Sequence, residues 1–575
     1  MSRRLVRLRQ ASQFVFLAAF LALFAAAAYR RGAGVPVDTF LRADPLIALS
    51  AMLSLRRILL PLLWFSLPVV VLSLLLGRVF CGWICPLGTA IDLCERALRI
   101  RGRRPAKAPA WRRVKFYVLL ALLVTMLLPV AHYDVGPRGL RDSVGLAATY
   151  VLDPIALLTR TVTWSIFPAV QWATSSTSQT LTGYYYSDYV AKYPLLERAL
   201  SPFQTEDLAF ARPVYFRLGL ATLLMFAGII ALGLLANRFW CRNLCPLGAL
   251  LGYLGRRAPV RLHVSEACNR CMKCVNECKT GAITEDPHVY RGPECIGCYR
   301  CLAVCPKEAI SLTSGIGDRE SGIGGRDDAV RLDRRRVLGA AGVGLAAAVL
   351  PKVDWGTKPS SARERRLKVS GERLIRPPGA KPENAFVTGC VRCGECMAVC
   401  PTNTLQPALG EGGLEALGTP LLVPRIGPCT QECNACGNVC PARVLEPFTV
   451  EEKSYLHLGT ASVDRSTCIA WAEGKQCVVC DEACSYDAIT QDVADKIGRP
   501  VVHRDICVGC GLCEFVCPVE PRGAIRVSSS GDSRHQTRAE QRARWEAAKP
   551  ERDAAESAPR SPGRQETGGG SPYPG

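Results

Sequence analysis

Most of the chemistry available to this chain depends on its cysteines, of which it has 29 in 575 residues. They come in tight runs, in which neighbouring thiols are two or three residues apart. Cysteines this close in sequence pair with each other only under strain, which argues against a disulfide framework. Several thiolates on one loop are typical of a metal site, either an iron–sulfur cluster or structural zinc.

The first two runs share the spacing C-x2-C-x2-C-x3-C. In bacterial two-cluster ferredoxins, three cysteines of such a run bind one [4Fe–4S] cluster and the fourth binds the cluster of the other run. Zinc usually takes two pairs of cysteines, so these triplets favour iron–sulfur clusters. The predicted ligand sets are Cys268, Cys271, Cys274 with Cys305, and Cys295, Cys298, Cys301 with Cys278.

Four further runs follow between residues 385 and 527, with two departures in spacing. The first gap holds three residues after Cys429 and eight after Cys468, so spacing alone supports those ligands less. The tripeptides GAI, EAI, DAI and GAI follow the fourth cysteine of four runs and predict β-hairpins of α+β ferredoxin modules. The predicted sets are Cys390, Cys393, Cys396 with Cys440; Cys429, Cys433, Cys436 with Cys400; Cys468, Cys477, Cys480 with Cys517; and Cys507, Cys510, Cys513 with Cys484. We therefore predict six [4Fe–4S] clusters.

A different motif occurs twice in the N-terminal half, as RVFCGWICPLG (78–88) and RFWCRNLCPLG (238–248). The repetition predicts a tandem repeat of a helix hairpin. One interpretation is a helix stop with buried thiols. The functional interpretation is a redox or metal site, or one wall of a quinol pocket. The thiols concerned are Cys81, Cys85, Cys241 and Cys245.

Two single residues carry weaker signals. Cys94 is alone, and we expect it to be buried without a role. His132 would lie at the outer end of the third apolar run, where it is a candidate acceptor for a quinol proton. A lone histidine is more often an interface residue.

Four apolar runs predict membrane spans, because each is near the ~20 residues that cross a bilayer. A formal net charge of +21 beside 49% hydrophobic residues also suits a membrane protein with basic loops. Its basic residues flank the apolar runs, which argues against nucleic-acid binding. The predicted spans are 12–29, 58–77, 114–131 and 214–236.

Loop charges set the predicted orientation. The N-terminus, segment 96–115 and segment 256–261 are rich in arginine, and the positive-inside rule places all three in the cytoplasm. Loop 132–213 then faces the periplasm. Its apolar stretch 144–170 is interrupted by Asp153, Pro154 and Arg160, so we interpret it as interfacial or re-entrant.

Composition divides the rest of the chain. Segment 313–330 is a Gly/Ser/Asp linker, and DRRRVLG (333–339) is similar to a twin-arginine export signal on Arg334 and Arg335. The apolar run 337–350 lacks a clear cleavage site, which predicts an uncleaved fifth span acting as a signal anchor. The predicted domains are a membrane domain (1–257), a cytoplasmic module (261–312), the linker and anchor (313–353), two further modules (385–450 and 451–527) and a disordered tail (528–575).

These motifs together carry a family resemblance. Residues 1–312 resemble the NapH ferredoxin-type family, and residues 331–527 resemble the NapG and MauM families, so the chain looks like a fusion of the two. The resemblance implies a quinol dehydrogenase component of a bacterial inner membrane. The soluble modules show no Rossmann glycine fingerprint, no P-loop and no acid–base constellation, which predicts that substrate chemistry other than quinol oxidation belongs to a partner. The resemblance also implies the membrane quinone pool and a periplasmic reductase or cytochrome as partners, typically in nitrate respiration.

The expected fold class is therefore a multi-domain membrane protein: four transmembrane helices, a fifth signal-anchor helix and three two-cluster α+β ferredoxin modules. The expected function is transfer of electrons from quinol to a periplasmic reductase. Two alternatives stay open, namely an assembly factor for a periplasmic metalloenzyme and an electron acceptor from a periplasmic dehydrogenase.

Overall fold

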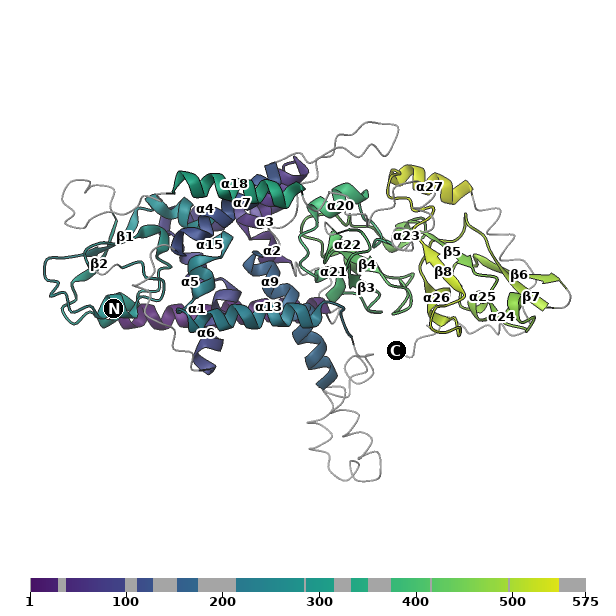
Figure 1. Cartoon of the computed structure of the whole chain (residues 1–575), viewed down its shortest axis with the longest axis horizontal. Coiled ribbons are helices and arrows are strands. Elements are labelled where there is room, and N and C mark those ends of the chain that lie inside the picture. The colour runs from purple at the N-terminus through teal and green to yellow at the C-terminus, as the bar shows by residue number, and fades with distance from the viewer. Residues whose placement is uncertain are drawn as a thin grey trace, which may run out of the picture. The chain divides into compact units, whose positions relative to one another are not determined.

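The computed structural model describes residues 2–28, 38–98, 111–127, 152–173, 214–283, 286–314, 332–349, 374–413, 416–494 and 497–547 (Figure 1). The chain forms two compact units. The first comprises residues 1–160, 221–353 and 387–393, and the second comprises residues 161–220, 354–386 and 394–575. The first unit thus joins the apolar helices to the first cysteine module.

Apolar helices form at all four predicted spans. Among the described residues, one helix, α1 (Ser2–Ala28), is long and apolar enough to cross a membrane, over Arg3–Ala27. The helices at the other three places are shorter, so a four-helix membrane domain stays a proposal. They are α4 (Leu60–Leu76), α7 (Val114–Leu127) and α13 (Gly219–Ala231), which continues into η6 (Leu232–Leu234).

Each of the two cysteine motifs breaks a helix. After α4, the first motif forms α5 (Val79–Trp83) and α6 (Pro86–Ala97); after η6, the second forms α14 (Phe239–Asn243) and α15 (Pro246–Leu254). Cys85 and Cys245 are N-cap residues with proline directly after them, because proline lacks the N–H that a continuing helix needs. The two thiols of a motif therefore belong to consecutive helices instead of one helix face.

The repeat extends upstream to a pair of aspartates. Asp44 caps α3 (Pro45–Leu55), with Oδ1 accepting the Leu46 N–H at 2.7 Å. Asp153 caps α9 (Pro154–Thr161) in the same way, accepting the Ala156 N–H at 2.8 Å. Both carboxyl groups are fully buried and close enough to hydrogen bond to each other. Asp153 and Pro154, which looked like an interruption of segment 144–170, start a helix within it.

The first cysteine module is a small α+β fold. Strands β1 (Val260–Val264) and β2 (Ile310–Ser314) pair antiparallel, Val264 opposite Ile310. Two short helices, α16 (Lys273–Glu277) and α17 (Arg300–Val304), each carry cysteines of one run. The core between them combines Cys274, Cys278 and Cys301 with Val275, Ala282, Ile283 and Ile310. The cysteines thus lie at the centre of the module.

The predicted signal anchor is helical and lies along α7. Helix α18 (Arg334–Val349) runs beside α7 in the first unit (Figure 1). Gly344 makes the close approach possible, because a Cβ there would lie 2.5 Å from the Ala121 carbonyl oxygen. At its start, the Asp333 N–H donates to the Tyr117 hydroxyl at 3.1 Å. Small residues that let two backbones meet are typical of helix pairs in membranes.

The second unit holds the remaining hairpins. Strands β3 (Leu405–Pro407) and β4 (Pro420–Leu422) form one antiparallel pair. β5 (Thr460–Val463) pairs with β8 (Ile525–Ser528), and β6 (Ile489–Ala494) with β7 (Ile497–Val502). The apolar residues that follow the fourth cysteines begin β2, β6 and β8. The short helices are α20 (Glu383–Gly389, which crosses into the first unit), α21 (Glu395–Ala398), α22 (Ala435–Asn438), α23 (Val450–Lys453), α24 (Ile469–Ala472), α25 (Val479–Glu482) and α26 (Leu512–Val516).

The start of the predicted disordered tail is ordered, so that prediction is wrong for residues 528–547. Helix α27 (Arg538–Ala547) is capped by Thr537, whose hydroxyl accepts the Glu540 N–H at 3.3 Å. The buried Gln541 donates to the Ser533 carbonyl at 2.7 Å, and Ser533 in turn bonds His457. The polar composition of this segment did not predict a helix, because α27 is held by its N-cap and by side-chain amides and has no apolar stripe.

The shorter elements complete the description. They are α2 (Thr39–Arg42), η2 (Trp111–Arg113), η3 (Val162–Ile166), η7 (Gly255–Arg257) and η8 (Gly292–Glu294).

Candidate functional site

The first module brings its cysteines together in two crossed groups. Cys268, Cys271 and Cys274 line one pocket together with Cys305 from the other run. In the second group, burial together with the nearby Cys298 and Cys278 raises the pKa of Cys295 to about 12. Cys301 lies within reach of the same three thiols. Buried, mutually close thiols suit a cation that stabilises their thiolates.

The second unit repeats this crossing in three pockets. Each holds three cysteines of one run and the fourth of its partner run, even where the first gap has three or eight residues. The sets are Cys429, Cys433, Cys436 with Cys400; Cys468, Cys477, Cys480 with Cys517; and Cys507, Cys510, Cys513 with Cys484.

The remaining set is divided between the units. Cys390 and Cys393 belong to the first unit, and Cys396 and Cys440 to the second. Three of these four are buried, and Cys396 is half-buried. Their grouping stays a prediction.

The loops share one backbone path. In four runs the residues two and four positions after the first cysteine have positive φ, although several are not glycine. A residue with positive φ also follows the fourth cysteine by three positions in five runs. The two runs with altered spacing lack the first feature. The four paired positions are Arg270 and Met272, Gly297 and Tyr299, Arg392 and Gly394, and Gly509 and Gly511.

Backbone N–H groups point at several of these sulfurs. The Ala282 N–H donates to Cys278 Sγ at 3.2 Å, and Ala488 and Ala524 donate to Cys484 and Cys517 at 3.3 Å. Such bonds stabilise thiolates and help to set cluster potentials. Among the described residues, no group of three or more His, Cys, Asp or Glu side chains is placed to hold a single metal ion.

One contact at the run with a longer first gap was not predicted from the sequence. Lys453, buried, donates to the Cys433 carbonyl at 2.7 Å and to the Thr430 carbonyl. Burial lowers the pKa of Lys453, but the neighbouring Cys429, Cys433 and Cys436 together outweigh this and the pKa is raised. The ammonium therefore holds the extra residue of this loop and adds positive charge beside the thiols.

The four thiols of the repeated motif also form one buried group. Cys81, Cys85, Cys241 and Cys245 are each less than a tenth exposed. Burial raises the pKa of Cys85 well above its usual value, and Cys81 and Cys241 add to the effect. Burial likewise raises the pKa of Cys245, with Cys241, Cys81 and Cys85 nearby. The two repeats therefore place their thiols within each other's electrostatic reach.

Two buried arginines exchange partners between the repeats. Arg78, from the first repeat, donates to the carbonyl of Cys241 at 3.0 Å. Arg238, from the second, donates to the carbonyl of Cys81 at 3.3 Å and to that of Gly88 at 3.0 Å. Both side chains are 0–1% exposed. Each arginine of the repeated sequence thus orders the cysteine motif of the other copy.

Carboxylates anchor these arginines. Asp92 bonds Arg238 through two contacts, at 2.9 and 2.7 Å, and Lys279 at 2.7 Å. Burial works against ionisation of Asp92, but Arg238 and Lys279 prevail and hold its pKa well below the usual range. Glu294 accepts from Lys115 at 2.6 Å and lies 3.4 Å from Arg78. Asp92, Glu294 and Lys115 were not singled out from the sequence, whereas Arg78 and Arg238 stand at the same place in both motifs.

The first motif touches a cysteine loop of the module. Trp83 donates its indole N–H to the Gly297 carbonyl at 2.9 Å. A Cβ on Gly82 would lie 2.1 Å from the Ile296 carbonyl oxygen. Cys81 is next to Gly82, and Cys295 is next to Ile296, so two cysteine sites meet across one backbone contact.

The other singled-out residues play no visible part. Cys94 is half-buried in α6, apart from the four thiols. His132 lies outside the described residues.

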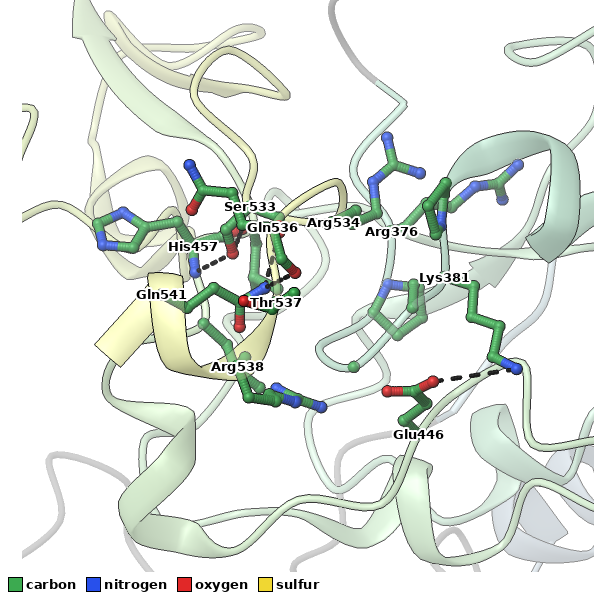
Figure 2. Close-up of a pocket in the computed structure, with 16 residues that line it drawn as sticks. Arg376, Lys381, Glu446, His457, Ser533, Arg534, Gln536, Thr537, Arg538 and Gln541 are labelled. Carbon is green, nitrogen blue, oxygen red and sulfur yellow. Dashed lines mark hydrogen bonds and ion pairs between the residues drawn. The ribbon is translucent and has the colours of Figure 1, made fainter. Parts of the chain in front are cut away.

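A polar pocket in the second unit lies beside α27 and was not predicted. Figure 2 shows Arg376, Arg534 and Arg538 on its rim, and an ion pair between Lys381 and Glu446 at 3.9 Å. Arg376 and Arg534 both bind Glu383, at 3.0 and 2.7 Å. No cysteine lines this pocket, so we assign it no role in electron transfer.

Crossed cysteine pockets on α+β modules define this protein as an iron–sulfur electron carrier of the ferredoxin type. A family described as "4Fe-4S binding domain" matches residues 58–105 and 218–264, and a second family of the same description matches residues 500–522.

Relatives narrow the assignment. The chain is 41% identical to the ferredoxin-type protein NapG of Escherichia coli over 204 residues, 34% of this chain and 82% of that protein. It is 40% identical to the methylamine utilization ferredoxin-type protein MauM of Methylorubrum extorquens, over 27% of this chain and 72% of that protein. The chain belongs to the NapG and MauM family of ferredoxin-type proteins. A putative electron transport protein of E. coli, YccM, is 24% identical over 41% of the chain. No solved structure matches.

Proposed function

We propose that this chain oxidises membrane quinol and passes the electrons through six [4Fe–4S] clusters to a periplasmic reductase or cytochrome. Quinol oxidation releases two electrons and two protons, and each cluster takes one electron at a time. The ligand sets are those predicted from the spacing, and five of the six lie together in the structure.

The observation that supports this function most is the contact between the first membrane motif and the loop Cys295–Cys301. The Trp83–Gly297 hydrogen bond and the Gly82–Ile296 approach leave no space between the two backbones. Electrons that reach the module from the side of this motif would therefore enter the cluster of Cys295 first, and that of Cys268 after it.

The experiment compares two reductants in inverted membrane vesicles. Quinol should bleach the cluster absorbance of the wild-type chain, and dithionite should bleach it further or equally. A chain that dithionite reduces but quinol does not, at any quinol concentration, contradicts the proposal. Iron and acid-labile sulfide in anaerobically purified protein establish that the clusters are present before the comparison.

We further propose that the chain crosses the membrane five times and that its cysteine modules face opposite sides. The packing of α18 against α7 supports this, because it joins the twin-arginine-like helix to a predicted span. Reporters fused after residue 312 and after residue 527 should read cytoplasmic and periplasmic. Two cytoplasmic readings would leave α18 as a docking helix on the inner face.

The likeness to MauM supports a second candidate, in which electrons run from a periplasmic dehydrogenase of methylamine utilization to quinone. The two directions differ in the potentials they need. Clusters with midpoint potentials above the quinone couple favour quinol oxidation, and lower potentials favour quinone reduction.

A further inference from the structure

We propose that Cys81, Cys85, Cys241 and Cys245 bind one additional iron–sulfur cluster, shared between the two repeats. This rests on the proposed function only for its place in the electron path. The site itself follows from five observations on the cysteine motifs, the arginines and the neighbouring loop.

The first observation is one of ligand number. The 4Fe-4S family matches residues 58–105 and 218–264, which contain no cysteine of the six predicted sets. Each copy supplies only two thiols of the C-x3-C-P type, whereas a cluster takes four protein ligands. One complete site therefore needs both copies.

The second observation is that both copies face one point. Cys245 lies within electrostatic reach of Cys241, Cys81 and Cys85, so the four thiols form one group. All four are buried in the same compact unit. A site that assembles from two halves of a repeat lies on the axis that relates them.

The third observation is the charge around that centre. Arg78 lies near Cys81, Cys245 and Cys241, and Arg238 lies near Cys241 and Cys85. Their carboxylates are already shared: Asp92 pairs with Arg9, Arg238 and Lys279, and Glu294 pairs with Arg78 and Lys115. Four buried cations and the half-buried Lys279 thus pair with two carboxylates, and the buried Glu95 accepts the Arg238 backbone N–H at 2.8 Å. Buried positive charge is costly without a partner, and a cluster with four thiolates is an anion.

The fourth observation concerns the sulfurs themselves. The Gly248 N–H donates to Cys245 Sγ at 3.3 Å. Backbone N–H groups also donate to Cys278, Cys484 and Cys517 of the ferredoxin modules, from residues four or seven positions downstream. Cysteines of the repeated motif and of the ferredoxin modules thus both accept backbone N–H hydrogen bonds at sulfur.

The fifth observation is position. Zinc has no redox chemistry, and a structural zinc site gains nothing from contact with an electron-transfer loop. Here Cys81–Gly82 lies against the loop that holds Cys295 and Cys298. A redox-active cluster fits this place, as the centre between quinol and the first ferredoxin module.

The test measures iron and sulfide per chain in anaerobically purified full-length protein. Wild type should exceed the ~24 irons of six cubes by the two or four irons of one further cluster. Cys85→Ala and Cys245→Ala should each lose that same excess, and the double variant should lose no more than either. Cys94→Ala, in the same helix as one motif but outside the group, should keep it.

Several results would overturn the proposal. One is an iron content of only six cubes in wild type. Another is a double variant that loses twice as much iron as each single variant. The third is zinc or copper at one per chain in place of the extra iron and sulfide. If the alanine variants fail to assemble, Arg238→Lys answers the question. Lysine keeps the positive charge but lacks the several N–H donors of the guanidinium. The midpoint potential of one cluster should therefore shift, and the potentials of the others should stay as in wild type. No shift in any cluster counts against the site.

This outcome is independent of quinol. A seventh cluster that quinol does not reduce would uphold the site and contradict the proposed function. Quinol-driven reduction with only six clusters would do the reverse.

Discussion

Trp83 donates its indole N–H to the carbonyl oxygen of Gly297 at 2.9 Å, and so ties the first membrane motif to a cysteine loop 214 residues away. The preceding Gly82 makes this approach possible, because no side chain fits between it and Ile296. The path proposed for electrons depends on this contact, which can be tested at single residues.

Gly82→Ala should slow quinol-driven reduction of all clusters. The new Cβ meets the Ile296 backbone oxygen at 2.1 Å, so the loop or the motif must shift. Gly228→Ala, in α13 with no atom within 4 Å of the new Cβ, is the matched control and should behave as wild type. Equal quinol-driven rates in both variants, with intact dithionite reduction, would place the electron path elsewhere.

Cys305→Ser should damage the cluster of Cys268, Cys271 and Cys274, because these four side chains line one pocket. Its own run, Cys295–Cys301, should keep its cluster. Spectra of the two clusters in the reduced protein distinguish the outcomes. Cys517→Ser should likewise affect the set of Cys468. Loss within the mutated run instead would show that the ligands are not crossed.

Gly344→Leu should detach α18 from α7. The leucine side chain has no room where a Cβ already lies 2.5 Å from the Ala121 carbonyl oxygen. Gly342→Leu, on the same helix with open space around it, is the control. Cross-linking between cysteines introduced on the two helices should fall in the first variant only, and equal cross-linking would deny the packing.

Acid should loosen the segment that leads into α27. Burial opposes ionisation of Glu383, but Arg376 and Arg534 prevail and hold its pKa below the usual value. Such a carboxyl contributes stability that is present above its unfolded pKa of about 4.3 and lost as the pH falls through its folded pKa. Amide exchange of residues 529–547 should therefore rise at low pH in wild type. In the Glu383→Gln variant, these amides should exchange faster at neutral pH, and their exchange should respond less to acid. If the variant responds to acid as wild type does, Glu383 is not the group whose protonation loosens the segment.

Thr537→Ala should cost about 1 kcal/mol of helix stability, as for the loss of an N-cap hydroxyl. Thr537 and Glu540 satisfy each other's backbone N–H at the start of α27. Faster exchange should be confined to 538–547 and leave β5 and β8 protected. Unchanged exchange in α27 would show that the cap contributes little there.

The spacing of the cysteines was enough to predict most of the candidate site. The run C-x2-C-x2-C-x3-C predicts which cysteine crosses to which partner, and the pocket of Cys468 shows that even a gap of eight residues closes in the same way. The contacts of Arg78 and Arg238 could not be predicted, since each depends on a carbonyl in the other repeat. Hydropathy located α4 to within two residues at each end, but it could not predict the helix breaks within the cysteine motifs, where Pro86 and Pro246 start new helices. The helix after residue 528 escaped notice because amides and caps hold it.

The exchanged arginines make the two repeats resemble the halves of an isologous dimer, in which each subunit gives its partner what it receives. Two of the positions at which the motifs differ bear on this symmetry. Gly82 of the first motif corresponds to Arg242 of the second, and Trp83 to Asn243. The glycine side touches the cysteine loop, while the buried Arg242 takes the equivalent place in the second copy. In the proposed electron path, the direct contact with the cysteine loop of Cys295 is therefore made by the first repeat.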